Sequence, residues 1–164
     1  MSVTANDIEF RLSGGTLNSN PNDSLGAGIS NEVISSGFLN NVWDSISGDE
    51  SEAGDTEYRG IYIMNDNDSD TLYNVKIWIS EEVSDSDVQI DIGIEEAIMQ
   101  QIANESIAPT GISFSHPISE SEALEIGNLG PNQYYGIWIK RIVSSGDTHF
   151  TSDGYTLTVK GETL

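Results

Sequence analysis

Short runs of alternating apolar and polar residues recur along the chain, and clusters of Gly, Asn, Asp and Ser separate them. Alternation with a period of two is typical of strands that show one face to a core and the other to water. In the clearest run, apolar residues at 88, 90, 92 and 94 alternate with Gln89, Asp91 and Gly93. We expect the apolar set to face the core, because a shift by one residue would bury Asp91 without a partner.

Similar runs predict further strands, which are separated by turn signals and show no internal repeat. The expected strands cover residues 8–12, 57–64, 73–80, 88–94, 112–114, 123–126, 134–143 and 155–160, with one more short strand near 38–46. Regularly spaced short strands of this kind favour an all-β fold. We therefore predict that residues 1–164 form a single antiparallel β-sandwich of the immunoglobulin-like type, with a jelly roll as the alternative topology.

One segment departs from the strand pattern. Ile94, Ile98 and Ile102 recur every four residues, and Glu and Gln residues lie between them. This spacing is typical of an amphipathic helix, so it predicts one short helical segment within residues 94–106.

Residues 13–56 are rich in Gly, Asn and Ser, and we expect this region to be largely irregular. Its first part, residues 14–30, is interpreted either as an extended arm or as a loop. If it is an arm, its apolar residues are the candidates for contact with a partner protein. With one aromatic residue further along the region, the candidate contact residues are Leu17, Leu25, Ile29 and Trp43.

The charge of the chain is strongly unbalanced, with 27 acidic residues against six Lys and Arg and a formal net charge of -21. The basic residues lie in or beside the predicted strands, whereas the acidic residues concentrate in the connections. Such a chain is expected to repel nucleic acid and anionic membranes, since both bind through clusters of Lys and Arg. The most acidic stretch, residues 48–57, is either a solvated charge run or a docking patch for a basic partner surface.

Other classes of site are also disfavoured by composition. The chain has no cysteine, which excludes disulfides and thiolate zinc sites. No apolar run approaches the ~18 residues of a membrane helix, and the first ten residues do not resemble a signal peptide. His116 and His149 stand in no known spacing with a nucleophile, so we expect no enzymatic activity.

One motif suggests a metal ion. Asp66, Asp68 and Asp70 form a D-x-D-x-D string, which resembles the start of a calcium-binding loop. However, Thr71 stands where such a loop needs Gly, and Ile77 stands where it needs a bidentate Glu. The alternative is a solvated hairpin turn in which Asp and Asn side chains bind their own backbone. Apart from this possible Ca²⁺, no cofactor is expected.

The large aromatic residues allow two interpretations. Flat rings on a sandwich face could stack against sugars, or they could fill the core or a subunit contact, which we favour. The residues concerned are Trp43, Tyr62, Trp78, Tyr134 and Trp138.

Four stretches of the chain, residues 7–30, 47–67, 102–117 and 124–143, together resemble a family of small virion structural proteins of tailed bacteriophages. The resemblance includes no catalytic motif and implies a structural role. It implies a capsid decoration (cement) protein, present in many copies on the virion and bound to the major capsid protein or to other virion subunits. The alternative that it allows is a tail or baseplate adhesion module that binds saccharides of the host cell surface.

Overall fold

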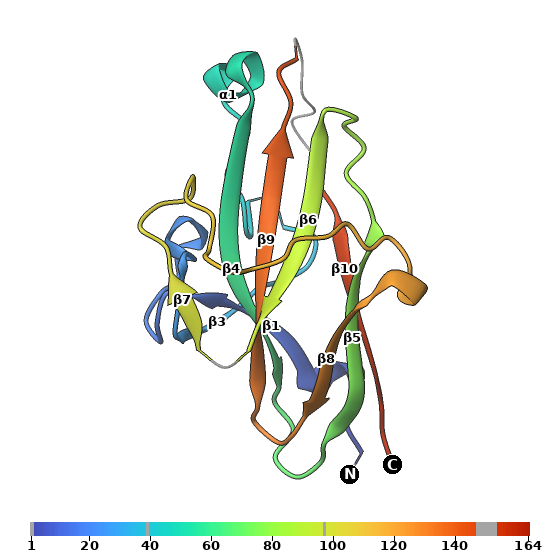
Figure 1. Cartoon of the computed structure of the whole chain (residues 1–164). Coiled ribbons are helices and arrows are strands. Elements are labelled where there is room, and N and C mark those ends of the chain that lie inside the picture. Colours follow the sequence, from blue (N-terminus) through green and yellow to red (C-terminus); the bar gives the residue numbers. More distant parts are fainter. Residues whose placement is uncertain (1, 39, 97, 147–153) are drawn as a thin grey trace.

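The computed structural model describes residues 2–38, 40–96, 98–146 and 154–164, in which strands dominate (Figure 1). The strands are β1 (Ile8–Ser13), β2 (Gly26–Ala27), β3 (Ile29–Val33), β4 (Asp55–Asn65), β5 (Leu72–Glu81), β6 (Val88–Glu95), β7 (Met99–Gln101), β8 (Leu124–Leu129), β9 (Tyr134–Val143) and β10 (Thr156–Glu162). The helical elements are the α-helix α1 (Gly48–Ala53) and three 3₁₀ turns, η1 (Ala5–Asp7), η2 (Pro21–Asp23) and η3 (Glu120–Glu122). Within the described residues, no helix has the length and apolar character needed to span a membrane.

The strands form two main antiparallel sheets, which confirms the predicted β-sandwich. One sheet has the order β3-β1-β4-β9-β6, the other has the order β10-β5-β8, and β2 and β7 form a separate two-stranded ribbon. If the three shortest strands, β2, β3 and β7, are left out, the other seven can be numbered in chain order. The first sheet then contains, side by side, the first, second, sixth and fourth of them. In the corresponding sheet of an immunoglobulin constant domain the order is first, second, fifth and fourth, so the third position holds the fifth strand instead of the sixth. The immunoglobulin-like order is therefore not confirmed.

The main core fills the space between the two sheets. Ile61 and Ile137 are paired across β4 and β9 and are 2% and 0% exposed, and they face the buried Val75, Ile77 and Ile79 of β5. Ile90 and Ile92 of β6 join the same core, as their alternation predicts. This register places one complete apolar face of each strand out of water.

The outer face of the five-stranded sheet is covered as well. Tyr62 and Trp138 lie on this face, and both are fully buried beneath the β2–β7 ribbon and the segment that follows it. The Tyr62 hydroxyl donates to the carbonyl of Ala27 at 2.5 Å and accepts the backbone N–H of Met99 at 2.8 Å. One buried phenol therefore fixes both strands of the ribbon to the sheet.

Glycines on the outer face make room for this covering layer. A Cβ at Gly136 would lie 2.4 Å from Cγ of Met99, and a Cβ at Gly93 would lie 2.6 Å from Cγ2 of Ile112. Both distances are far below normal contact. Small residues at these positions are therefore required for the ribbon and the 110–116 segment to lie directly on the sheet.

The helix predicted within residues 94–106 is wrong, because none of the described residues of this segment is helical. Ile94 belongs to β6, Ile98 is 66% exposed, and Ile102 packs beneath the ribbon. The short α-helix lies instead at α1, inside the acidic stretch. Ser47 and Glu50 form a reciprocal capping box at its start, which explains why a run of acidic residues is helical here.

Residues 14–30 form a folded loop, not an extended arm. The backbone N–H of Gly14 donates to the carbonyl of Gly26 at 2.7 Å, and that of Gly15 donates to Gly28 at 2.8 Å. Gly14, Gly15 and Gly26 have φ angles of 98°, 95° and 89°, which favour glycine. The loop therefore doubles back along itself and is tied to β1.

Two short strands predicted from sequence are also wrong. The described residues of 38–46 contain no strand, although Val42 and Trp43 reach the core from irregular backbone. Residues 112–114 are irregular too, and the neighbouring Ser115 makes only an isolated bridge to Ile92. Val42 and Trp43 are buried, and Ile112 and Phe114 are half-buried, through contacts with distant parts of the chain, which short runs cannot reveal.

Candidate functional site

All six basic side chains of the chain lie in strands, as the sequence predicts, and each is paired with a carboxylate. The pairs are Arg11 with Glu9 at 2.7 Å, Lys160 with Glu120 at 2.7 Å, Lys140 with Asp91 at 3.5 Å, Lys76 with Glu125 at 3.8 Å, Arg59 with Glu105, and Arg141 with Glu57. Because six cations cannot balance 27 acidic residues, the exterior remains strongly negative.

The most deeply buried charges surround the indole ring of Trp43. The guanidinium carbons of Arg59 and Arg141 lie 5.0 and 4.8 Å from its ring centroid, within the range of cation–π attraction. The indole N–H donates to the hydroxyl of Tyr155 at 3.0 Å, and burial raises the pKa of Tyr155 to about 12. Trp43, a candidate for partner contact, is only 9% exposed and contributes to the core of this structure.

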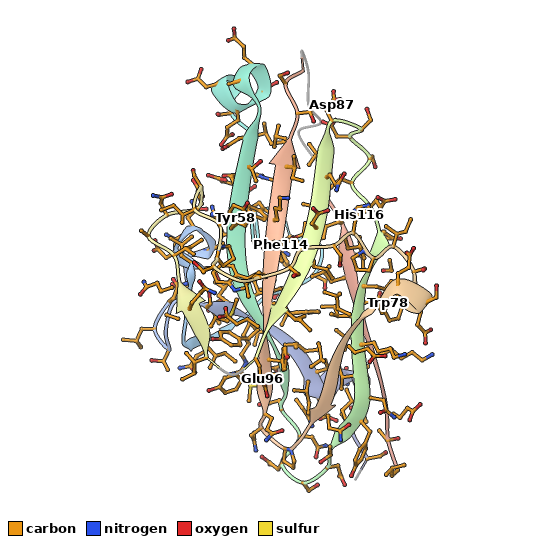
Figure 2. The ribbon with its side chains drawn as sticks, in the orientation of Figure 1. Tyr58, Trp78, Asp87, Glu96, Phe114 and His116 are labelled. Atoms are coloured by element: carbon orange, nitrogen blue, oxygen red, sulfur yellow. The ribbon has the colours of Figure 1, made fainter. Side chains whose placement is uncertain are left out.

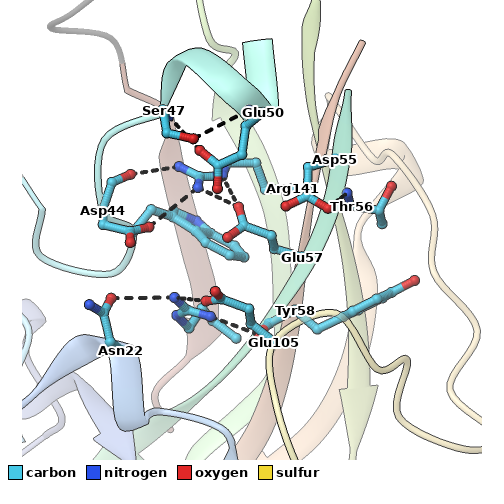
Figure 3. Close-up of polar contacts among 12 residues, drawn as sticks. Asn22, Asp44, Ser47, Glu50, Asp55, Thr56, Glu57, Tyr58, Glu105 and Arg141 are labelled. Atoms are coloured by element: carbon cyan, nitrogen blue, oxygen red, sulfur yellow. Dashed lines mark hydrogen bonds and ion pairs between the residues drawn. The ribbon is translucent and has the colours of Figure 1, made fainter. Parts of the chain in front are cut away.

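Beside Trp43, an ion pair joins β4 to β9. Nε of Arg141 donates to Oε2 of Glu57 at 2.7 Å, and Nη1 donates to the carbonyl of Asp44 at 2.8 Å (Figure 3). Glu57 is 1% exposed, and burial raises the pKa of its carboxyl although Arg141 opposes this. The other oxygen of Glu57, Oε1, has no hydrogen-bond partner among the described residues.

Two more carboxylates meet Glu57 at this end of β4. One oxygen each of Glu50, Asp55 and Glu57 lies within 4.8 Å of the others, and no other such group of three occurs in the described part of the chain. Asp55 and Glu57 alternate along β4 and so share a face, while α1 brings Glu50 above them (Figure 3). The spacing of two between Asp55 and Glu57 is the available sequence signal, but the acidic run by itself indicates only a solvated stretch or a docking patch.

The Asp66, Asp68 and Asp70 string lies in the turn between β4 and β5. Within the described part of the chain, their carboxylates do not converge as a group of three. Oδ1 of Asn67 accepts the backbone N–H of Asp70 at 2.8 Å, and Oδ1 of Asn65 accepts that of Asn67 at 3.2 Å. This geometry supports the hairpin-turn alternative, in which side chains stabilise their own backbone.

His116 lies where the 110–116 segment crosses the edge of β6 (Figure 2). Its Nδ1 is 2.6 Å from the carbonyl of Ile90, and its Nε2 is 2.6 Å from Oε1 of Glu82. Burial acts to lower the pKa of His116, but these two contacts and the nearby Asp91 raise it above the ordinary value. The residue lines a cleft of about 220 Å³ with Val83 and other neighbours, whereas His149 lies outside the described residues.

A second hollow lies beside β3, which is an edge strand of the five-stranded sheet. We call this hollow the β3 groove; it has a volume of about 260 Å³. The groove is lined by Leu12, Ser19, Pro21, Glu32, Val33, Ile34, Ser35, Phe38 and Asn41. Val33 and Phe38 are 41% and 71% exposed, so apolar surface is open to water here.

The three apolar candidates of the N-terminal loop have different positions. Leu25 and Ile29 pack against the buried residues beneath the ribbon, including Tyr62 and Trp138. Leu17, in contrast, is 93% exposed. Of the three, only Leu17 is openly accessible to a partner.

The aromatic residues mostly fill cores and do not form a surface platform. Trp43, Tyr62 and Trp138 are buried, and Tyr134 packs edge-on against Tyr62 with ring centroids 5.3 Å apart. Trp78, on β5, is only partly buried (Figure 2). Our preferred interpretation of these residues as core is therefore confirmed for the three buried rings.

Comparison with known proteins gives no relative. No family model matches the chain, and neither the curated proteins nor the solved structures contain a significant match.

Proposed function

We propose that this chain is a non-enzymatic structural protein of a tailed-bacteriophage virion that decorates the outer capsid shell. The observation that carries the proposal is the β3 groove, a partly apolar hollow at a sheet edge on an otherwise acidic molecule. Exposed apolar surface beside the edge strand of a sheet is typical of a protein-binding surface. The resemblance of the four stretches named above to phage virion proteins supports the same role.

The charge distribution supports a protein partner over nucleic acid. Every Lys and Arg is held by a carboxylate of the same chain, so no cation is left to form a phosphate-binding cluster. A shell protein bound this way would sit outside the packaged DNA and would not compete for it. Attachment in many copies would make a small contact sufficient on each subunit.

The burial of most candidate aromatic rings favours a position on the shell over one on the tail. An adhesion module that binds saccharides would need aromatic rings on its surface, and three of the five candidate rings are buried. Trp78 and Tyr134 are the rings that remain partly accessible. Tail adhesion therefore stays a second candidate with weaker support.

The decisive experiment is to measure the copy number of the chain in purified phage particles by quantitative mass spectrometry, with antibody labelling in electron micrographs. We expect a copy number comparable with that of the major capsid protein and label over the shell. A copy number that matches the tail, with label confined to it, would favour the adhesion module. Absence of the chain from particles would contradict both.

The role of the β3 groove is tested by adding the purified protein to particles that lack it. Phe38→Asp should abolish attachment, because it places a charge on the exposed apolar wall of the groove. Ile118→Asp is the matched control, since Ile118 is 48% exposed but does not line the groove. If both variants attach as the unchanged protein does, the contact lies elsewhere.

A further inference from the structure

The cluster of Glu50, Asp55 and Glu57 is incompletely satisfied as it stands. Glu57 is nearly inaccessible to water, yet its Oε1 has no hydrogen-bond partner among the described residues. A buried carboxylate oxygen without a partner is costly, because water can no longer solvate its charge. Such an oxygen, next to two further carboxylates, calls for a positively charged group.

Arg141 supplies only part of that charge. Its guanidinium pairs with Oε2 of Glu57 and with Asp44, whereas Glu50 and Asp55 have no basic partner among the described residues. The neighbouring Arg59 is paired with Glu105 and so does not contribute.

The two outer carboxylates are oriented by their own backbone contacts. Oε2 of Glu50 accepts the N–H of Ser47 at 2.5 Å, and Oδ1 of Asp55 accepts the N–H of Thr56 at 2.7 Å. These contacts hold both side chains on the Glu57 side of the helix–strand junction (Figure 3). Each contact holds one oxygen of its carboxylate.

The spacing of the cluster is compatible with a bound Ca²⁺ ion. Two oxygens that bind a single Ca²⁺ from opposite sides lie about 4.6–5.2 Å apart, since each Ca–O distance is about 2.3–2.6 Å. The three oxygens lie within 4.8 Å of one another, which agrees with this limit. Mg²⁺ requires shorter distances, about 2.0–2.1 Å, and a near-ideal octahedron. Three carboxylates of a partly exposed junction can complete the larger and more tolerant Ca²⁺ shell with water.

We propose that Glu50, Asp55 and Glu57 bind one Ca²⁺ ion at the junction of α1 and β4. The ion would neutralise the unpartnered oxygen of Glu57 and would fix α1 to the sheet. This site is separate from the β3 groove and does not depend on the proposed function. It also differs from the Asp66, Asp68 and Asp70 turn, to which the D-x-D-x-D motif had pointed.

The test is calorimetric titration of the full chain, stripped with EDTA, with CaCl₂ and with MgCl₂ at equal ionic strength. We expect one Ca²⁺ per chain, clearly weaker binding of Mg²⁺, and a melting temperature that rises with Ca²⁺. Asp55→Asn and Glu50→Gln should each weaken Ca²⁺ binding roughly tenfold or more. Both variants leave the buried Glu57–Arg141 pair intact, and Gln at position 50 still supports the capping box.

Two control variants make the outcome decisive. Asp49→Asn removes an exposed charge from α1 that is outside the cluster, and Asp68→Asn alters the 65–71 turn; both should bind Ca²⁺ as the unchanged chain does. Loss of binding in Asp68→Asn but not in Asp55→Asn would overturn the proposal and place the ion in the turn. Absence of Ca²⁺ binding in the unchanged chain at millimolar concentration would also overturn it.

Discussion

Glu57 and Arg141 form an ion pair across neighbouring strands in which both side chains are almost completely removed from water, at 1% and 6% exposure. They are directly opposite each other in the β4–β9 register. Burying both charges of such a pair costs free energy of desolvation. Removing only one partner destabilises the protein far more, because the other charge stays buried without a counter-ion. The pair therefore makes the α1 end of the sandwich sensitive to single substitutions.

Replacing Arg141 tests this sensitivity. Arg141→Met should lower the free energy of unfolding by about 3–5 kcal/mol, because Glu57 would remain buried without a cation. The matched control is Arg11→Met, whose partners Glu9 and Asp66 are 23% and 45% exposed, and which should cost about 1 kcal/mol or less. Urea denaturation of the two variants measures the difference. Similar losses in both would show that burial does not set the strength of the pair.

The N-terminal loop should matter for stability, because it folds onto the sheet. Ser24 is fully buried; its Oγ accepts the N–H of Ser13 at 2.8 Å and donates to the carbonyl of Gly60 at 2.7 Å. Ser24→Ala would leave these groups unpaired and should cost about 1–3 kcal/mol. Ser19→Ala, at an exposed position of the same loop, serves as the control in thermal melts. Equal melting temperatures would mean that the loop does not contribute to folding.

The covering layer should tolerate no side chain at Gly136. A Cβ there would meet Cγ of Met99 at 2.4 Å and the carbonyl oxygen of Glu95 at 2.8 Å. We expect Gly136→Ala to destabilise the protein by about 1–3 kcal/mol, since the ribbon must move away from the sheet. Gly48→Ala is the control, because a Cβ at Gly48 meets no atom within 4 Å. Equal denaturation midpoints for the two variants would contradict this packing.

His116 should make stability depend on pH. Its folded pKa is raised above 6.5, so its contribution is complete below that pH and is lost as the pH rises through the folded pKa. The stability difference between the unchanged chain and His116→Gln should therefore shrink from pH 6 towards pH 8. Glu82→Gln should reduce this dependence, since it removes the carboxylate on Nε2. Denaturation curves measured across that range would reject the assignment if the difference were constant.

The main core provides the fifth test. Ile90 is 2% exposed and lies between the sheets, so Ile90→Ala should cost about 2–5 kcal/mol. Gln89→Ala, on the same strand but exposed, should stay within about 0.5 kcal/mol of the unchanged protein. If thermal melting does not separate the two, the assigned register of β6 is incorrect.

The sequence predicts best where local pattern and environment agree. The range 134–143 matches β9, because alternation there reflects a strand whose neighbours are strands on both sides. The pattern fails where segments that are distant in the sequence determine which side chains are buried. Asp91 was expected to face water, but it is 8% exposed because the 110–116 segment covers it, and it pairs with Lys140 and His116.

The helix error and the missed cluster have the same origin. A period of four at Ile94, Ile98 and Ile102 fits a helix, but it equally fits a strand, a turn and another strand when the ends pack in different cores. The sequence does not indicate the cluster of Glu50, Asp55 and Glu57 for a similar reason. Glu57 and Arg141 are 84 residues apart, so nothing local marks Glu57 as the buried member of an acidic run.

The confinement of every Lys and Arg to strands has a consequence for proteolysis. Trypsin cleaves only after these residues and needs a flexible, extended stretch of chain in its active site, which a hydrogen-bonded strand does not offer. In this protein all six possible cleavage points lie inside β1, β4, β5, β9 or β10, and the acidic connections contain none. We therefore expect the native chain to resist trypsin because of the placement of its cations, so that tryptic digestion would report on opening of the sheets rather than on motion of the loops.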